Sequence, residues 1–217
     1  MKWLLLTLLL ALSANGLDYA IEIKDSSYVD SNAGPFGNKI IQINDSLAYV
    51  HVPGNHDREK QINDLLRLHE WNTNRVLYKD PNLLVLEAYS YKEGGAHPTE
   101  TYYGINVDVN TPKIIEFGDV FSDMIGLKLL LRKKLAAMAY EYFIKNKSYH
   151  NIGDPDEVIK MNLDDAYADA FALTEKGVYF YYNYCHFSCV VGYIKLWVPY
   201  EEMRGILIQG GNYVHSF

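Results

Sequence analysis

Apolar and polar positions alternate along much of the chain, and this alternation predicts strands. The run DYAIEIK shows it near the start, and NLLVLEAYSYK and TETYYGINVDVN show it most clearly. Near the end, an aromatic run and a run that stops at Pro199 fit the same pattern. The predicted strands cover residues 18–24, 39–44, 47–52, 82–92, 99–110, 178–184 and 191–199. Residues 163–177 fit either a strand or a short helix that ends at Gly177.

A helical period replaces the alternation at residues 57–71, which follow the breaker Pro53-Gly54-Asn55. The apolar face of this predicted helix repeats at steps of three and four residues. Asn55 or Asp57 is suited to cap its first turn. The expected inward positions are Ile62, Leu65, Leu66 and His69.

The longest helical pattern covers residues 126–147, where good helix formers follow one another without an interior Gly or Pro. We expect it to begin after a capping residue at Asp119 or Ser122. Arg132, Lys133 and Lys134 are interpreted as its solvated face. The expected apolar stripe is Leu127, Leu130, Leu131, Leu135 and Met138.

This order of elements favours one α+β domain, with an antiparallel sheet packed by one long helix and shorter helices. The domain is expected to cover residues 17–217, because residues 1–16 have the pattern of a secretory signal. A basic residue, Lys2, precedes an apolar run at 4–12, and small residues follow it. Cleavage before Leu17 would place Ala14 at −3 and Gly16 at −1, and cleavage after Ala14 is the alternative. The run is too short to span a bilayer, so we expect a periplasmic or secreted protein without a membrane span after processing.

Charge narrows the class of partner. The whole chain carries −7, and loss of the single charge at Lys2 would leave −8. An acidic exported protein is a poor ligand for nucleic acids, whose phosphates need Lys and Arg. It is better suited to a basic partner. The sequence also has 19 Tyr, a residue common in sheets and at interfaces.

Two cysteines, Cys185 and Cys189, have three residues between them in YYNYCHFSCVVGY. In an oxidising compartment they are expected to form a disulfide. A soft metal site that includes His186 is the alternative. It has little support, because a structural zinc site needs four ligands and no second Cys/His pair lies nearby.

Motifs of known chemistry are missing from the sequence: it has no GxSxG, phosphate-binding loop or HExxH. His51 and His56 flank Pro53-Gly54, so the pattern fits either a metal site or a solvent-facing turn. The turn is preferred, because no third ligand can be identified. Neighbouring carboxylates such as Glu201-Glu202 point to different faces of a helix. We interpret them as charges exposed to solvent and not as a catalytic pair. We therefore expect no catalytic residues, metal or cofactor.

The segment EGGAHP, residues 93–98, joins the two strongest predicted strands. Gly94 and Gly95 are interpreted as structural turn residues, since glycine accepts the positive φ of a hairpin corner. Pro98 would stiffen the entry to the next strand. His97 is then a turn residue that flanks a binding surface rather than a catalytic base.

Two stretches, YSYKEGGAHPTETYYGINVDVNTPKIIEFGDVF and GVYFYYNYCHFSCVVGYIKLWVPYEEM, carry a family resemblance. In order, and separated by one long helix, they resemble the RsiV-type extracellular domain, the lysozyme-sensing part of an anti-sigma factor. Related domains of this kind also occur beside cell-wall polysaccharide deacetylases. The resemblance covers about residues 60–210. It implies an α+β fold like a small subdomain of the heat-shock-protein ATPases.

The resemblance also implies a non-catalytic envelope protein that binds a lysozyme or another wall-associated partner. A peptidoglycan- or glycan-binding module is the first alternative, and an envelope carbohydrate hydrolase or deacetylase is the second. The family's contact loop corresponds to residues 184–189, where a disulfide would replace the family's proline as the stiffening element. The predicted partner-binding residues are Tyr184, His186, Phe187, Ser188, His97 and Tyr102.

Overall fold

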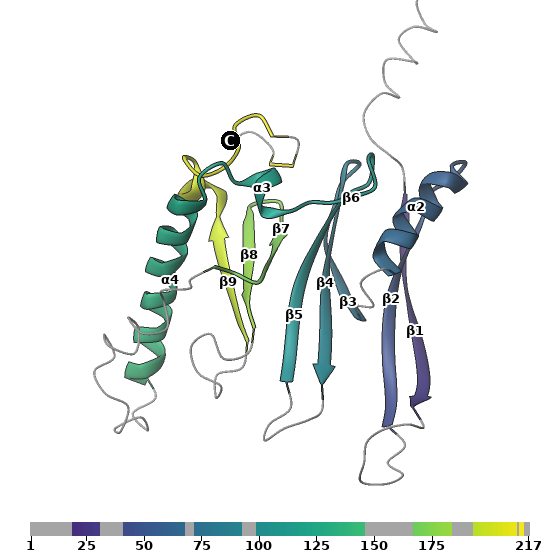
Figure 1. Ribbon diagram of the computed structural model, residues 1–217, viewed down its shortest axis with the longest axis horizontal. Coiled ribbons are helices and arrows are strands. Elements are labelled where there is room, and N and C mark those ends of the chain that lie inside the picture. Colours follow the sequence, from purple (N-terminus) through teal and green to yellow (C-terminus); the bar gives the residue numbers. More distant parts are fainter. Residues whose placement is uncertain are drawn as a thin grey trace, which may run out of the picture. The chain divides into compact units, whose positions relative to one another are not determined.

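Three antiparallel sheets and a few helices make up the computed structural model of this chain (Figure 1). It describes residues 19–30, 41–67, 72–92, 99–145, 167–183, 193–211 and 213–214. The predicted α+β class with antiparallel strands is confirmed, although the strands are divided over several sheets. The likeness to the heat-shock-protein ATPase fold stays a prediction.

The chain forms two compact units, each of which is described by itself. The first contains Met1–Ala88 and Asn106–Ile114, and the second contains Tyr89–Ile105 and Ile115–Phe217. The single domain expected over residues 17–217 stays a prediction.

The first unit begins with a long hairpin of β1 (Ala20–Asp30) and β2 (Ile41–His51). The two strands predicted at 39–44 and 47–52 are one strand, so this prediction was wrong. Asp45 and Ser46 pair in register with Ser26 and Asp25 of β1. The ladder therefore continues through two residues of low strand propensity, because cross-strand pairing outweighs local preference.

A tight turn leads from β2 into helix α2 (His56–Arg67), which lies against β2 (Figure 1). The N–H of Asn55 donates to the carbonyl of Val52 at 3.1 Å, and Gly54 has a φ of 73°. A type II turn requires such a positive φ at its third residue, which explains the glycine. The Asn55 side chain then accepts the N–H of Arg58 at 3.1 Å, as predicted for the cap.

The inward face of α2 is only partly the predicted one. Ile62 and Leu66 are buried as expected, but the third buried residue is the polar Asn63 and Leu65 is half-buried. His69 lies outside the described residues.

The four-stranded sheet has the order β3-β4-β5-β6. Its strands are β3 (Asn72–Lys79), β4 (Leu83–Lys92), β5 (Thr99–Asp108) and β6 (Lys113–Ile114). β4 and β5 are the two strands predicted most strongly, while β3 was missed because it begins with the polar residues NTNR. Every residue from Leu83 to Ala88 is buried, so both faces of β4 are covered there. The Asp108 carboxylate accepts the N–H groups of Asn110 and Thr111 and shapes the predicted turn.

The second unit holds the sheet of β7 (Ala170–Leu173), β8 (Gly177–Tyr182) and β9 (Ile194–Pro199), followed by the 3-10 helix η1 (Tyr200–Met203). Val178, Phe180 and Tyr182 alternate along β8 and are buried. Around them the rings of Phe117, Phe121 and Phe171 pack against one another. Phe121 also packs against Phe180.

Helices α3 (Phe117–Val120) and α4 (Met124–Lys145) precede this sheet in the chain. The cap of α4 is Asp123, whose carboxylate accepts the N–H of Gly126 at 2.8 Å, and not Asp119 or Ser122 as predicted. Asp119 instead accepts the N–H of Glu116 ahead of α3. In the described part of the chain, no helix is long and apolar enough to cross a bilayer.

The buried stripe of α4 is narrower than expected. Leu127, Leu131 and Leu135 are almost completely buried, and Leu130 is half-buried. Met138 was predicted inside, but 40% of it is exposed. A spacing of four residues keeps the three leucines on one side of the helix. At about 100° per residue Met138 falls on the same side, so its exposure does not follow from the helical period.

Candidate functional site

The described chain brings three tyrosines of the second unit together. The ring of Tyr102 on β5 lies 5.1 Å from that of Tyr89 on β4 and 4.0 Å from that of Tyr193, between centroids. We call Tyr89, Tyr102 and Tyr193 the tyrosine cluster. All three are accessible to solvent, and 37% of Tyr193 is exposed. Such rings offer a large apolar contact area with a polar rim.

Hydrogen bonds of the main chain fix the cluster in place. The Tyr102 N–H donates to the Asn183 side-chain oxygen at 2.9 Å, and the Asn183 N–H donates to the Asp169 carboxylate at 2.6 Å. Asp169 in turn donates its N–H to the carbonyl of Tyr181 at 2.9 Å. This chain of bonds ties the first half of β5 to the start of β7 and the end of β8.

Gly104 makes this approach possible. A Cβ atom built at this position would lie 2.2 Å from the carbonyl oxygen of Phe171 and 2.7 Å from the Cβ of Ala172. Real Cβ atoms do not come so close to a backbone oxygen, so only glycine allows β5 to pass β7 at this distance. Tyr102, two residues earlier on β5, is therefore held beside Asn183.

The cluster lies near the ends of two segments singled out from the sequence, residues 184–189 and residues 93–98. Asn183 comes directly before residues 184–189, and Tyr193 follows four positions after their end. Tyr89 and Tyr102 lie on the strands on either side of residues 93–98. Of the predicted partner-binding residues, the structure describes Tyr102. Outside the described residues lie Tyr184, His186, Phe187, Ser188, His97, Gly94, Gly95, Cys185 and Cys189.

The other two members of the cluster, Tyr89 and Tyr193, were not predicted as site residues. Neither were Asn183 and Asp169, whose hydrogen bonds hold Tyr102. The signal for Tyr193 was present, since it lies in the predicted strand at 191–199, on the same face as the exposed Trp197 four residues later. For Asn183 and Asp169 we find no local signal.

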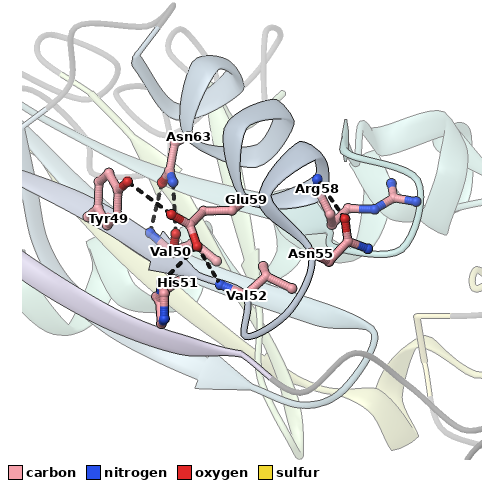
Figure 2. A network of polar contacts seen from close by, with 8 residues as sticks. All are labelled: Tyr49, Val50, His51, Val52, Asn55, Arg58, Glu59 and Asn63. Carbon is pink, nitrogen blue, oxygen red and sulfur yellow. Dashed lines mark hydrogen bonds and ion pairs between the residues drawn. The ribbon is translucent and has the colours of Figure 1, made fainter.

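A second polar group, in the first unit, surrounds Glu59 of α2 (Figure 2). Its carboxylate accepts the N–H of Val52 at 3.0 Å and the hydroxyl of Tyr49 at 3.2 Å, and it lies 2.7 Å from Nδ1 of His51. The hydrogen bond from Val52 is the main cause that lowers the pKa of Glu59, and the Tyr49 hydroxyl and the His51 ring add to it. These contacts join the first turn of α2 to the end of β2.

The structure places His51 and His56 on either side of the turn at Pro53-Gly54. His51 contacts Glu59, and His56 is the first residue of α2. In the described residues, no three His, Cys, Asp or Glu side chains gather in a way that could hold a metal ion. Asn63 lies beside Glu59 in Figure 2, and both of its amide atoms bond to the main chain of Val50 at 2.8 Å. The group therefore serves to attach α2 to β2.

Two solved structures have a similar fold. A DUF3298 family member from Bacteroides fragilis superimposes with a TM-score of 0.65 at 16% identity, over 90% of this chain and 96% of that one. A DUF3298 family protein from Pseudomonas aeruginosa PAO1 gives 0.58 at 17% identity, over 88% and 95%. No protein-family model and no curated protein matches the sequence. The likeness over almost the whole length of both chains shows that this chain has the fold of the DUF3298 structures.

Proposed function

We propose that the chain is a non-catalytic binding protein of the cell envelope, and that its tyrosine cluster is part of the surface that holds a lysozyme-like protein. One observation carries the proposal: Tyr102 contacts Tyr193 and bonds to Asn183, so residues that flank both predicted loops meet at one place. Aromatic side chains of this kind dominate the energetics of protein interfaces.

The resemblance to the RsiV-type domain supports the class of partner, and the fold shared with the DUF3298 structures is consistent with it. Charge supports it as well. The chain carries −7, and attraction between an acidic protein and a basic one raises the rate at which they meet.

The test measures binding of a basic lysozyme to the purified chain by surface plasmon resonance, with lysis of cell walls as a second readout. We expect a complex that Tyr102→Ala weakens by about thirtyfold, which corresponds to the loss of roughly 2 kcal/mol at an interface hot spot. The main-chain bond to Asn183 is retained in this variant. Tyr167→Ala is the matched control, because Tyr167 is exposed in the same unit and is not in the cluster.

Two results would contradict the proposal. One is the absence of both a complex and inhibition of lysis at micromolar concentrations. The other is equal binding by the parent chain and Tyr102→Ala, which would place the contact elsewhere.

A glycan-binding module is the second candidate, and one observation favours it. Trp197 on β9 stands directly opposite Tyr179 on β8, and 44% of Trp197 is exposed. The ammonium group of Lys195 lies 4.2 Å from the centroid of the Tyr179 ring. Sedimentation with purified peptidoglycan separates the two candidates. Loss of wall binding in Trp197→Ala, together with competition by sugar fragments, would favour the glycan.

A further inference from the structure

Helix α4 is apolar on two opposite sides, which is unusual for a helix at the surface of a protein. Its buried side consists of Leu127, Leu131 and Leu135. Ile125 and Leu129 are each offset by two residues from this series, a rotation of about 200° around the helix axis. They are 74% and 62% exposed. The outward side of an ordinary surface helix carries polar residues. Two exposed aliphatic side chains there therefore indicate a surface that another molecule covers.

The outward side is also basic. Lys133 continues the spacing of four residues from Ile125 and Leu129 and is exposed, and Lys128 and Arg132 lie one position before Leu129 and Lys133. The segment from Met124 to Met138 contains four Lys or Arg and no Asp or Glu, in a chain whose net charge is −7. The nearest preceding carboxylate, Asp123, is bonded to the Gly126 N–H as the helix cap.

An aromatic ring completes the patch. The ammonium group of Lys128 lies 4.5 Å from the centroid of the half-exposed Tyr167 ring. Tyr167 itself belongs to the segment before β7, so the aliphatic residues and the cations alone are supplied by α4. Exposed aliphatic residues and cations on one helix face, with an aromatic ring beside them, are typical of helices that lie in the interface of a bilayer. The fourth cation, Lys134, points elsewhere, since it is paired with Glu202 of η1 at 2.8 Å.

We propose that this side of α4, formed by Ile125, Leu129 and Lys133 with Lys128 and Arg132 beside them, binds the surface of an anionic phospholipid bilayer. Charge complementarity selects the occupant: the lysines face lipid phosphates while the two aliphatic side chains enter the headgroup region. The helix lies on the membrane and does not cross it. The proposal uses none of the residues of the tyrosine cluster, so it stands or fails separately from the proposed function.

Co-sedimentation with vesicles tests it. The chain used begins at Leu17, because the apolar residues 4–12 would bind vesicles by themselves, and circular dichroism confirms the fold of each variant. Vesicles of phosphatidylglycerol mixed with phosphatidylcholine are compared with vesicles of phosphatidylcholine alone. We expect binding to the anionic vesicles that weakens as salt is raised.

Three variants locate the contact. Lys133→Glu should weaken binding at least fivefold, the effect of about one cation at an anionic surface. The double variant Ile125→Ser with Leu129→Ser should weaken it at least tenfold while the charge is unchanged. Lys176→Glu is the control, because this exposed lysine lies in the turn between β7 and β8 and not on α4. The binding of this variant to anionic vesicles should stay within twofold of the parent.

Absence of binding to anionic vesicles would overturn the proposal. So would binding that survives in the double serine variant, since the aliphatic contact would then be unnecessary. Binding of poly-glutamate that depends on Lys133, without binding of vesicles, would also overturn it and would indicate an acidic protein partner.

Discussion

Asn63 takes the place that a neighbouring strand would occupy beside Val50. Its side-chain amide donates to the Val50 carbonyl and accepts from the Val50 N–H, both at 2.8 Å, and the side chain is buried. A buried backbone group without a partner is costly, so this one side chain satisfies two such groups at once. These two bonds explain why a polar residue lies on the buried face of α2.

Asn63→Ala should lower the free energy of unfolding by about 2–5 kcal/mol, because each buried group left without a partner costs about 1–3 kcal/mol. The better helix propensity of Ala offsets less than about 1 kcal/mol of this. Urea unfolding measures the change. Asp64→Ala is the matched control on the outer face, where loss of the exposed pair with Lys60 should cost at most about 1 kcal/mol. Equal midpoints for the two variants would show that the Val50 contacts are unimportant.

Glu59 should make stability depend on pH. Because its pKa is lower in the folded chain than its ordinary value of 4.5, its ionised form is favoured by folding. Its contribution is therefore present above pH 4.5 and is lost as the pH falls through the lowered pKa. Glu59→Gln keeps the shape and removes the charge. The stability difference between parent and variant should be present at pH 7 and should shrink in acid, as measured by urea unfolding at several pH values. A difference that is constant from pH 7 into the acid range would contradict the assignment.

At the scale of elements, one glycine decides how β5 meets β7. The contact at Gly104 involves the backbone carbonyl of Phe171, which cannot swing aside as a flexible side chain would. Tyr102 and Asn183 depend on the same approach, so the geometry of the tyrosine cluster depends on a residue that has no side chain.

Gly104→Ala should destabilise the chain by about 1–3 kcal/mol, the usual cost of forcing an extra methyl into a packed site. It should also change the near-ultraviolet circular dichroism, since the tyrosine rings around Tyr102 would shift. Gly118→Ala is the control: this glycine lies in α3 with open space around it, and alanine there should be neutral or should add up to about 1 kcal/mol. An unchanged stability in Gly104→Ala would mean that β5 and β7 are not held at this distance.

At the scale of the whole molecule, sequence reasoning predicted more of the fold than of the site. The α+β class, the two strong strands β4 and β5, the aromatic β8 and the long α4 all follow from patterns within a short window. Tyr102 was predicted as a site residue, but its neighbours in space were not. They come from residues 81 and 91 positions later in the chain, which no pattern of neighbouring residues can connect.

The sequence by itself determined features whose causes are local. The turn at Pro53-Gly54 and the cap at Asn55 depend on the φ of one residue and on one side chain. The period of apolar residues was enough to set α4 and its inner leucines, because the helix repeats every 3.6 residues.

Only the tertiary structure decided the features that depend on long-range pairing. These features are the continuation of β2 through Asp45 and Ser46, the strand β3 in a segment that begins with polar residues, and the contact of the three tyrosines near Gly104. The physical reason is the same in each case. A strand gains most of its stability from its partner, and a binding surface is formed by segments that are distant in sequence, so neither is encoded in neighbouring residues alone.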